Sequence, residues 1–276
     1  MGRIFRVLLF LLLLPQLSWA ATERIVLRSN GNDLVGLLTR PEINSEQKVP
    51  LVILMHGLAA TKEYPIILDT AKALEQNGIA TLRFDFNGHG ESGGRDVDMT
   101  ILNEMDDARL FTHYALQQDW VSSVTLLGHS QGGLIAGYLA AEFGSEHIPS
   151  LVLLSPAAVL LEMPKSGMLA GQSFFDPKHL PDVFPLNSYF NMGKAYITTM
   201  TDLPPVYKTA KSYQGNVLLF EGTADFVVPP SYVKPYAQAY PHCDFKLLEG
   251  DNHSFSVHHQ QVVDDIVAFV LQQNKN

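Results

Sequence analysis

Short apolar segments alternate with helical patterns along most of the chain. From residue 51 onward the apolar segments are continuous rather than alternating with polar residues, which is typical of parallel strands buried on both faces. The strand-length segments are 23–28, 34–39, 51–55, 80–84, 124–127, 151–154, 217–220 and 245–248. The segments with helical spacing are 64–76, 99–118, 132–143, 231–240 and 260–272. This order predicts an α/β fold, with a mostly parallel eight-stranded sheet and helices on both of its faces.

The pattern changes at two places. The first two apolar segments are joined by Ser29-Asn30-Gly31-Asn32-Asp33, a turn-rich link that favours an antiparallel hairpin at one edge of the sheet. Between Pro156 and Gly215 the alternation stops, and prolines and aromatic residues replace any clean period. Long irregular segments inside compact domains are commonly functional loops, so we expect a lid insertion at about 157–215.

The first twenty residues have the features of a secretory signal peptide. Arg3 and Arg6 precede a short apolar run, and Ser18 and Ala20 follow it as small residues. The run is too short to cross a bilayer of roughly 30 Å, which needs about 20 apolar residues. We therefore expect cleavage after Ala20, no stable membrane insertion afterwards, and a mature domain at 21–276 in the periplasm or outside the cell. An uncleaved N-terminal anchor is the alternative.

Charge and cysteine content exclude several classes of protein. The formal net charge is −9, and loss of the two arginines with the signal peptide would make it −11. Because no cluster of Lys or Arg offsets this charge, nucleic acid is excluded as a partner. Cys243 is the only cysteine, so no disulfide can form within the chain. No sequence feature requires a metal or a cofactor, and the oligomeric state, a homodimer included, stays open.

A candidate nucleophile lies between an apolar strand and a helix. The stretch Gly128-His129-Ser130-Gln131-Gly132 has the G-x-S-x-G spacing of a strained strand–turn–helix, in which side chains at the two glycine positions would collide with backbone. The spacing therefore predicts Ser130 as a nucleophile. The alternative is a phosphate-binding turn, but that motif needs a longer glycine loop followed by Lys.

A serine hydroxyl needs a base, and the base needs an orienting acid. Asp225 follows the strand segment 217–220 and His253 follows 245–248, so both lie where the carboxyl ends of parallel strands meet at one edge. Two alternatives concern the acid: Asp225 caps a turn, or Asp251 or Glu249 orients the histidine instead.

A metal site built from His253, His258 and His259 is a further alternative. The H-E-x-x-H spacing that would support it is missing. If His56 acted as the base instead, His253 would have no role.

The negative charge formed during attack must meet fixed donors. One donor is expected to be the backbone N–H of Gln131, which opens the helix after Ser130. The other is expected in the loop His56-Gly57-Leu58-Ala59, where Leu58 N–H is the best candidate. Gly57 would then allow the loop to approach Ser130, and the His56 imidazole would hold it by hydrogen bonds.

Motifs spread over almost the whole mature chain resemble those of the α/β-hydrolases. They are Met55-His56-Gly57, the D-F-N-G-H-G-E-S stretch at 85–92, G-H-S-Q-G-G at 128–133, Ser155-Pro156-Ala157-Ala158, G-T-A-D at 222–225 and E-G-D-N-H at 249–253. The order Ser, Asp, His is also that of this superfamily. The D-x-x-G-H-G-x-S pattern is shared by lysophospholipases, monoacylglycerol lipases and related peptidases. The longer run that continues into M-T-I-L-N-E, together with the insertion, is most similar to bacterial cinnamoyl (feruloyl) esterases.

The resemblance implies a serine esterase that acts on small aryl esters through an acyl-enzyme. In that subfamily, polar groups of the lid hold the hydroxyl of the substrate ring. Tyr196 is the candidate here, with packing of the lid as its alternative role. Gln172 matches a family glutamine only loosely, and Glu162 stands near the place of a family aspartate.

Three alternatives to an aryl esterase stay open. One is a lysophospholipase or monoacylglycerol lipase that acts on acyl-chain esters, and another is a serine peptidase of the same fold. The third is a non-catalytic binding protein.

Overall fold

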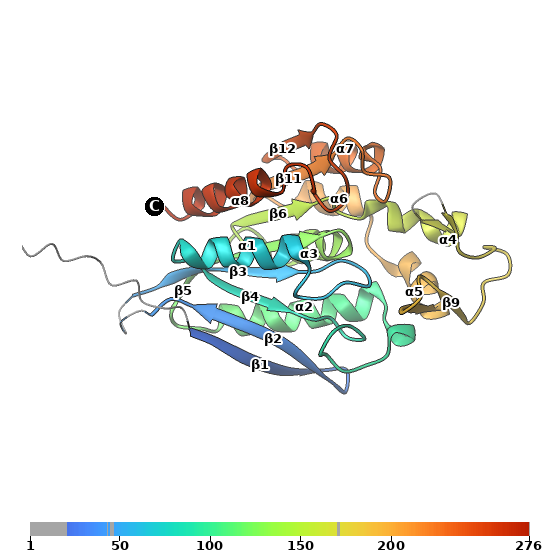
Figure 1. The fold of residues 1–276 in the computed structure, drawn as a ribbon, viewed down its shortest axis with the longest axis horizontal. Helices are drawn as coiled ribbons and strands as arrows, with labels where there is room; N and C mark the ends of the chain where they lie inside the picture. Colours follow the sequence, from blue (N-terminus) through green and yellow to red (C-terminus); the bar gives the residue numbers. More distant parts are fainter. Residues whose placement is uncertain (1–20, 43, 45–46, 170–171, 276) are drawn as a thin grey trace, which may run out of the picture.

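One mixed sheet of eight strands organises the chain. The computed structural model describes residues 21–42, 44, 47–169 and 172–275, and the expected signal peptide lies outside them. The strands follow the order β1-β2-β4-β3-β5-β6-β11-β12 (Figure 1). They are β1 Ala21–Ser29, β2 Asn32–Arg40, β3 Val49–Met55, β4 Ala80–Phe84, β5 Val121–His129, β6 Ser150–Leu154, β11 Asn216–Gly222 and β12 Cys243–Leu248. From β4 to β12 neighbouring strands are parallel, so their carboxyl ends share one edge.

The antiparallel hairpin expected at one edge is present. β1 pairs with β2 over its full length, and β2 in turn pairs antiparallel with β4. The turn between β1 and β2 contains Asn30 and Gly31, with φ of 49° and 84°. Asn and Gly are the residues that tolerate positive φ at both central positions of such a turn.

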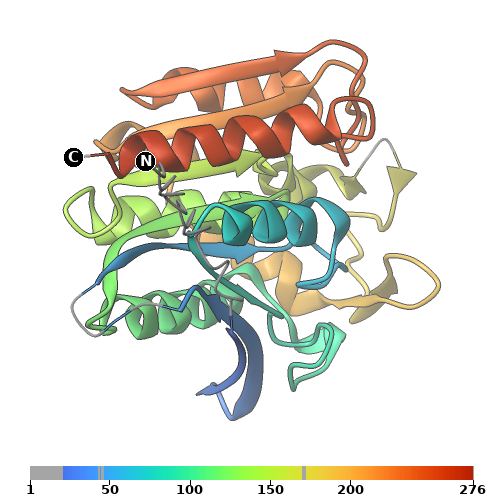
Figure 2. The same cartoon turned by 60° about the vertical axis from the view of Figure 1, so that its left-hand side comes forward.

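Helices cover both faces of the sheet. They are α1 Pro65–Gln76, α2 Ile101–Leu116, α3 Gln131–Phe143, α7 Pro230–Ala239 and α8 His259–Gln273. α1 and α8 lie side by side over one face (Figure 2), and they enclose a core with side chains such as Val52, Leu54 and Phe220. α2, α3 and α7 enclose a second core on the opposite face. Since both faces are covered, β6 is buried throughout and β3 is buried from Leu51 onward, which explains their continuous apolar sequence.

The segment between β6 and β11 adds an irregular layer. It contains the short helices α4 Met163–Ser166, α5 Lys194–Thr198 and α6 Val206–Ser212, and the 3-10 turns η2 Ala158–Glu162 and η3 Thr199–Asp202. Two small hairpins complete it, β7 Met168–Leu169 with β8 Gln172–Ser173 and β9 Val183–Pro185 with β10 Asn191–Gly193. In Figure 1, α4, α5 and β9 lie at the opposite end of the molecule from the C-terminus.

The insertion is attached to the rest of the domain by specific hydrogen bonds. The Tyr138 hydroxyl of α3 donates to the carbonyl of Pro204 at 2.8 Å. The Asn191 N–H donates to Asp96 Oδ2 at 2.7 Å, which ties β10 to the 3-10 turn η1 Asp96–Asp98. Across the described ranges, no helix combines the length and apolar character needed to cross a membrane.

Candidate active site

Ser130 lies at a sharp turn between β5 and α3. Its backbone has φ 55° and ψ −119°, a left-handed conformation that is strained for any residue except glycine, and 9% of the residue is exposed. A Cβ on Gly128 would lie 2.2 Å from the carbonyl oxygen of Gly132, and a Cβ on Gly132 would lie 2.4 Å from that of His56. Both glycines are therefore sterically required, as the sequence pattern predicts.

His253 and Asp225 meet at the same edge of the sheet. His253 Nδ1 is 2.7 Å from Asp225 Oδ2, and Asp225 Oδ1 accepts the N–H groups of Val227 and Val228. Burial raises the pKa of Asp225, but the His253 hydrogen bond and charge and the two N–H donors outweigh it, so the pKa is lowered overall. The ionised carboxylate accepts the Nδ1 proton, which leaves Nε2 of His253 as a proton acceptor.

The other acidic candidates have different partners. Asp251 is buried, and its carboxylate accepts the N–H groups of Asn252, Val257 and His258, so it holds the loop that carries His253. Glu249 is exposed. His258 pairs with Asp251 and His259 with Asp69, so these two histidines do not converge with His253 on a common centre.

The loop after β3 packs directly against Ser130. A Cβ on Gly57 would lie 2.9 Å from Ser130 Cβ, so only glycine allows this approach. His56 Nδ1 donates to the Gly57 carbonyl at 2.8 Å, and His56 Nε2 accepts the N–H of Phe86 at 3.1 Å. Burial, with His89 nearby, lowers the pKa of His56 well below its usual range, so the ring is neutral and structural.

The two expected oxyanion donors face no acceptor within the described part of the chain. None of its hydrogen bonds uses the backbone N–H of Leu58 or of Gln131, whereas the next N–H along the loop, that of Ala59, donates to His89 Nε2 at 3.2 Å. Free N–H groups beside the Ser130 side chain are what an oxyanion at this position would require.

A cavity of about 360 Å³ opens above Ser130. Ser130, His253 and Leu58 line it from the core, and Leu160, Leu169 and Leu186 line it from the insertion. The polar lining on the insertion side comes from Asn187 and Tyr189, of which Tyr189 is 74% exposed. The cavity has the volume and mostly apolar walls of a small-molecule site.

The three expected lid contacts do not line this cavity. Tyr196 is completely buried, and its hydroxyl donates to Gln131 Oε1 at 2.5 Å, so it does not face a substrate. Gln172 is exposed on β8. Glu162 is part of η2 and pairs with Lys165 at 3.7 Å. The sequence could not place these three side chains relative to the cavity, because spacing does not determine which way a side chain of an irregular insertion points.

Two further buried residues near the Asp225–His253 pair were not singled out from the sequence. His129 Nε2 donates to the His253 carbonyl at 2.9 Å, and burial, with the charge of His253, lowers the pKa of His129 to about 3. Burial, with the Asp225 carboxylate nearby, raises the pKa of Glu221 to about 9. A carboxylic acid inside an otherwise apolar strand was the sequence signal that could have singled out Glu221.

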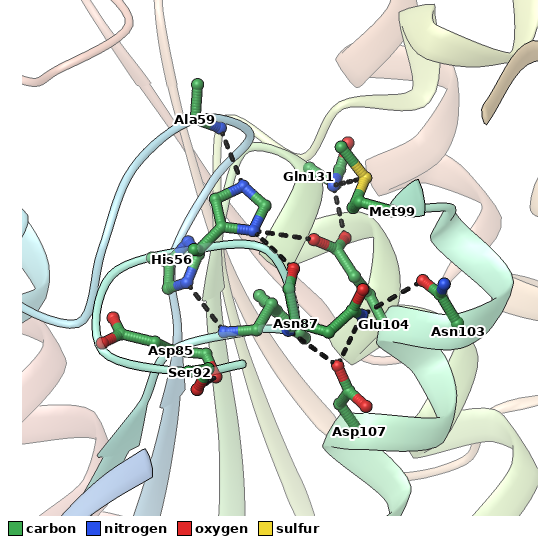
Figure 3. Close-up of polar contacts among 12 residues, drawn as sticks. His56, Ala59, Asp85, Asn87, Ser92, Met99, Asn103, Glu104, Asp107 and Gln131 are labelled. Carbon is green, nitrogen blue, oxygen red and sulfur yellow. Dashed lines mark hydrogen bonds and ion pairs between the residues drawn. The ribbon is translucent and has the colours of Figure 1, made fainter. Parts of the chain in front are cut away.

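Buried polar contacts surround the base of the site (Figure 3). The Asp85 carboxylate accepts the N–H of Lys62 and the ammonium of the same residue, at 2.7 and 2.6 Å. Ser92 donates to the Asp85 carbonyl at 2.6 Å, and Asn87 donates to Asp107 at 2.7 Å. These bonds fix the loop after β4, which in turn supports the loop that carries Leu58.

The chain belongs to the α/β hydrolases: the family model for the alpha/beta hydrolase fold matches residues 50–201. It is similar to Est1E from Butyrivibrio proteoclasticus, solved with ferulic acid bound, at 30% identity over 91% of this chain and 100% of that chain, with a TM-score of 0.85. A second Est1E structure matches at 28% identity over 92% and 99%, with a TM-score of 0.80. No curated protein matches the sequence. The expected fold and family are therefore confirmed.

A more distant structure shares the fold alone. The monoacylglycerol lipase of Paleococcus ferrophilus is 20% identical over 87% of this chain and 99% of its own, with a TM-score of 0.67. The family match and the similarity to Est1E at 30% identity together make the chain an esterase-like α/β hydrolase.

Proposed function

We propose that the chain is an exported serine esterase that hydrolyses small aryl esters of the cinnamoyl or feruloyl type. The observation that carries the proposal is the Asp225–His253 pair at 2.7 Å, whose histidine lines one mostly apolar cavity together with a strained Ser130. The similarity to Est1E with ferulic acid bound supports an aromatic acyl group.

The geometry supports a two-step mechanism. Ser130 Oγ attacks the ester carbonyl while His253 Nε2 takes its proton, and Asp225 stabilises the resulting imidazolium. The N–H groups of Leu58 and Gln131 receive the negative charge that develops on the carbonyl oxygen. His253 then protonates the departing alcohol, and water repeats the cycle on the acyl-enzyme.

A panel of esters tests this proposal. We expect turnover of methyl ferulate, labelling of the wild type by a fluorophosphonate probe, and a loss of about 10⁴-fold or more in kcat for Ser130→Ala. If the wild type is not labelled and Ser130→Ala matches it on every ester, the chain is not a serine hydrolase, and a binding protein of the same fold becomes the better hypothesis.

The second candidate is a hydrolase of acyl-chain esters, such as a monoacylglycerol lipase or lysophospholipase. The leucines that line the cavity from the insertion favour it, because they suit an alkyl chain as well as a ring. Rapid turnover of p-nitrophenyl octanoate with negligible turnover of methyl ferulate would replace the aryl hypothesis by this one. Cleavage of peptides but not esters would favour the third alternative, a serine peptidase.

Export is the remaining part of the proposal. It rests on Arg3, Arg6 and the apolar run that follows them. Expression of the full chain in a bacterium should give a periplasmic or secreted product whose N-terminal residue is Ala21. Recovery of intact chain in the cytoplasm would contradict export.

A further inference from the structure

A set of buried polar side chains lies between the insertion and both expected oxyanion donors. At the insertion end, the Tyr196 hydroxyl of α5 donates to Gln131 Oε1 at 2.5 Å. At the other end of the same amide, Gln131 Nε2 donates to Glu104 Oε2 of α2. The Gln131 side chain is therefore held at both ends, although its own backbone N–H stays free.

The set continues from Glu104 to the loop that carries Leu58. Glu104 Oε1 lies 3.6 Å from His89 Nδ1, which is van der Waals contact rather than a hydrogen bond, and Oε1 has no hydrogen-bond partner among the described residues. The Nδ1 hydrogen of His89 is donated to the Asn87 carbonyl at 3.0 Å. His89 Nε2 accepts the N–H of Ala59 at 3.2 Å, one peptide unit beyond Leu58 N–H. Figure 3 shows Glu104 between Gln131 and the contacts that lead to Ala59.

Burial disfavours the charged form of each titratable member of this set. Burial, reinforced by the nearby Asp107 carboxylate, raises the pKa of Glu104 well above its usual range. Burial also lowers the pKa of His89 and raises that of Tyr196 well above its usual range. An uncharged set avoids the large desolvation cost of buried ions and keeps His89 Nε2 as an acceptor for Ala59.

The backbone at Ala59 needs such an anchor. Ala59 has a φ of 54°, which is unfavourable for a residue with a Cβ, so the Ala59 N–H must be held by its surroundings. The Glu104 and Tyr196 side chains are completely buried and do not line the cavity, so neither contacts the substrate.

We propose that Glu104 and Tyr196 are positioning residues for the oxyanion hole, and that Tyr196 makes its geometry depend on the seating of the insertion. The inference rests on the proposed esterase function. Glu104 holds the first turn of α3 through its hydrogen bond with Gln131, and it packs against the His89 ring that holds the Ala59 N–H. Tyr196 adds the second clamp on Gln131 from α5, so displacement of the insertion releases one end of that side chain.

The test compares an ester with its thiono analogue, in which sulfur replaces the carbonyl oxygen. N–H donors stabilise a developing O⁻ better than the larger, weaker acceptor S⁻, so the ratio of oxo to thiono rates reports on the oxyanion hole. With p-nitrophenyl acetate, Tyr196→Phe should lower kcat about tenfold and leave KM within about twofold of the wild type. The oxo-to-thiono ratio should fall by a similar factor. The loss in kcat is smaller than the roughly 10²- to 10³-fold loss that follows removal of an oxyanion donor itself.

Glu104 provides an independent variant pair. Glu104→Met removes both contacts and should lower kcat more than Tyr196→Phe does, while Glu104→Gln keeps a neutral polar group and should restore most of that loss. If Glu104→Met does not fold, Tyr196→Phe alone still decides the question.

Tyr213→Phe is the matched control. Tyr213 is also buried, and its hydroxyl donates to the Ile148 carbonyl at 2.7 Å, away from the cavity lining. This variant should keep the wild-type kcat and oxo-to-thiono ratio.

If folded Tyr196→Phe keeps the wild-type oxo-to-thiono ratio, because the oxo and thiono esters lose rate equally or not at all, the positioning role is overturned. Failure of the wild type to hydrolyse any ester would instead contradict the proposed function, so the two failures are distinguishable.

Discussion

Glu221 and Asp225 stand four positions apart, yet their carboxyl groups have opposite pKa shifts. Asp225 accepts two backbone N–H groups and the His253 imidazole, which together hold its charge. Glu221 Oε2 has no hydrogen-bond partner within the described residues, and the Asp225 charge is close. The pair therefore places one negative charge behind His253 rather than two, because the second carboxyl keeps its proton.

The raised pKa of Glu221 predicts a pH dependence of stability. The native state binds the proton more tightly than the unfolded state, so this contribution is complete below pH 4.5 and is lost as the pH rises toward about 9. Within that window the group lowers the free energy of unfolding by up to about 1.4 kcal/mol per pH unit. Urea unfolding between pH 5 and 9 should show a flatter profile for Glu221→Gln than for the wild type.

The exposed Glu249→Gln serves as the control for this experiment and should keep the wild-type slope. Parallel profiles for Glu221→Gln and the wild type would mean that Glu221 is ionised in the native state.

At the scale of residues, the sequence predicted the positions whose chemistry is tied to a local pattern. Ser130 follows from its two glycines, and Asp225 and His253 follow from their places after buried strands. Tyr196 could not be placed in this way, because its partner Gln131 is 65 positions away and the contact depends on how the insertion folds. The role proposed for Glu104 could not be predicted from the sequence for the same reason, because it depends on how α2, α3 and the loop after β4 meet in the fold.

At the scale of elements, the close approach of β5, α3 and the loop after β3 fixes the site. Gly132 lies where a side chain would meet the backbone of two residues, with Met55 O at 2.5 Å as well as His56 O. Neither carbonyl can move without shifting β3. The sharp turn at Ser130 is therefore determined by backbone packing rather than by side-chain contacts.

This packing predicts a large difference between two glycine substitutions. Gly132→Ala should lower the free energy of unfolding by about 3 kcal/mol or more, or prevent folding, because buried backbone must move. Gly78→Ala should cost only about 1 kcal/mol, since Gly78 has a positive φ but open space around it. Denaturant unfolding of both variants provides the comparison, and equal losses would show that the collision at Gly132 is relieved without a costly movement of buried backbone.

The regular elements were predictable because their patterns are local. The bounds of β4 agree with the apolar run 80–84, and β5 extends the predicted run to Val121–His129. The short strands of the insertion, such as β7 and β9, were not predicted. Two or three residues are too few to show a period, and their pairing is set by the surrounding fold.

At the scale of the whole molecule, stability comes from two apolar cores, one on each face of the sheet. Cys243, the only cysteine, begins β12 at the edge and is free. Burial, with Asp244 nearby, raises the pKa of its thiol to about 12. The thiolate is the reactive form, so the native thiol reacts slowly with thiol reagents.

Thermal unfolding should therefore be the same with and without a reducing agent. A chromogenic thiol reagent at pH 8 should label the native chain about 100-fold more slowly than the chain in urea, because few native thiols are ionised. A Tm that falls on reduction would instead reveal a disulfide between two copies of the chain. Fast labelling of the native protein would show that the β12 edge opens readily.

The left-handed backbone residues also bear on how the protein can be engineered. Ala59, Ser130, Ser155 and Phe255 all have positive φ, and each lies beyond the carboxyl end of a strand of the main sheet. Such conformations cost of order 1–3 kcal/mol of stability each. The chain therefore carries this cost at the edge of the sheet that holds the proposed active site. Selection for heat resistance alone would favour relaxing these positions first and would lose turnover with them. Directed evolution of this hydrolase therefore needs an activity screen at every round.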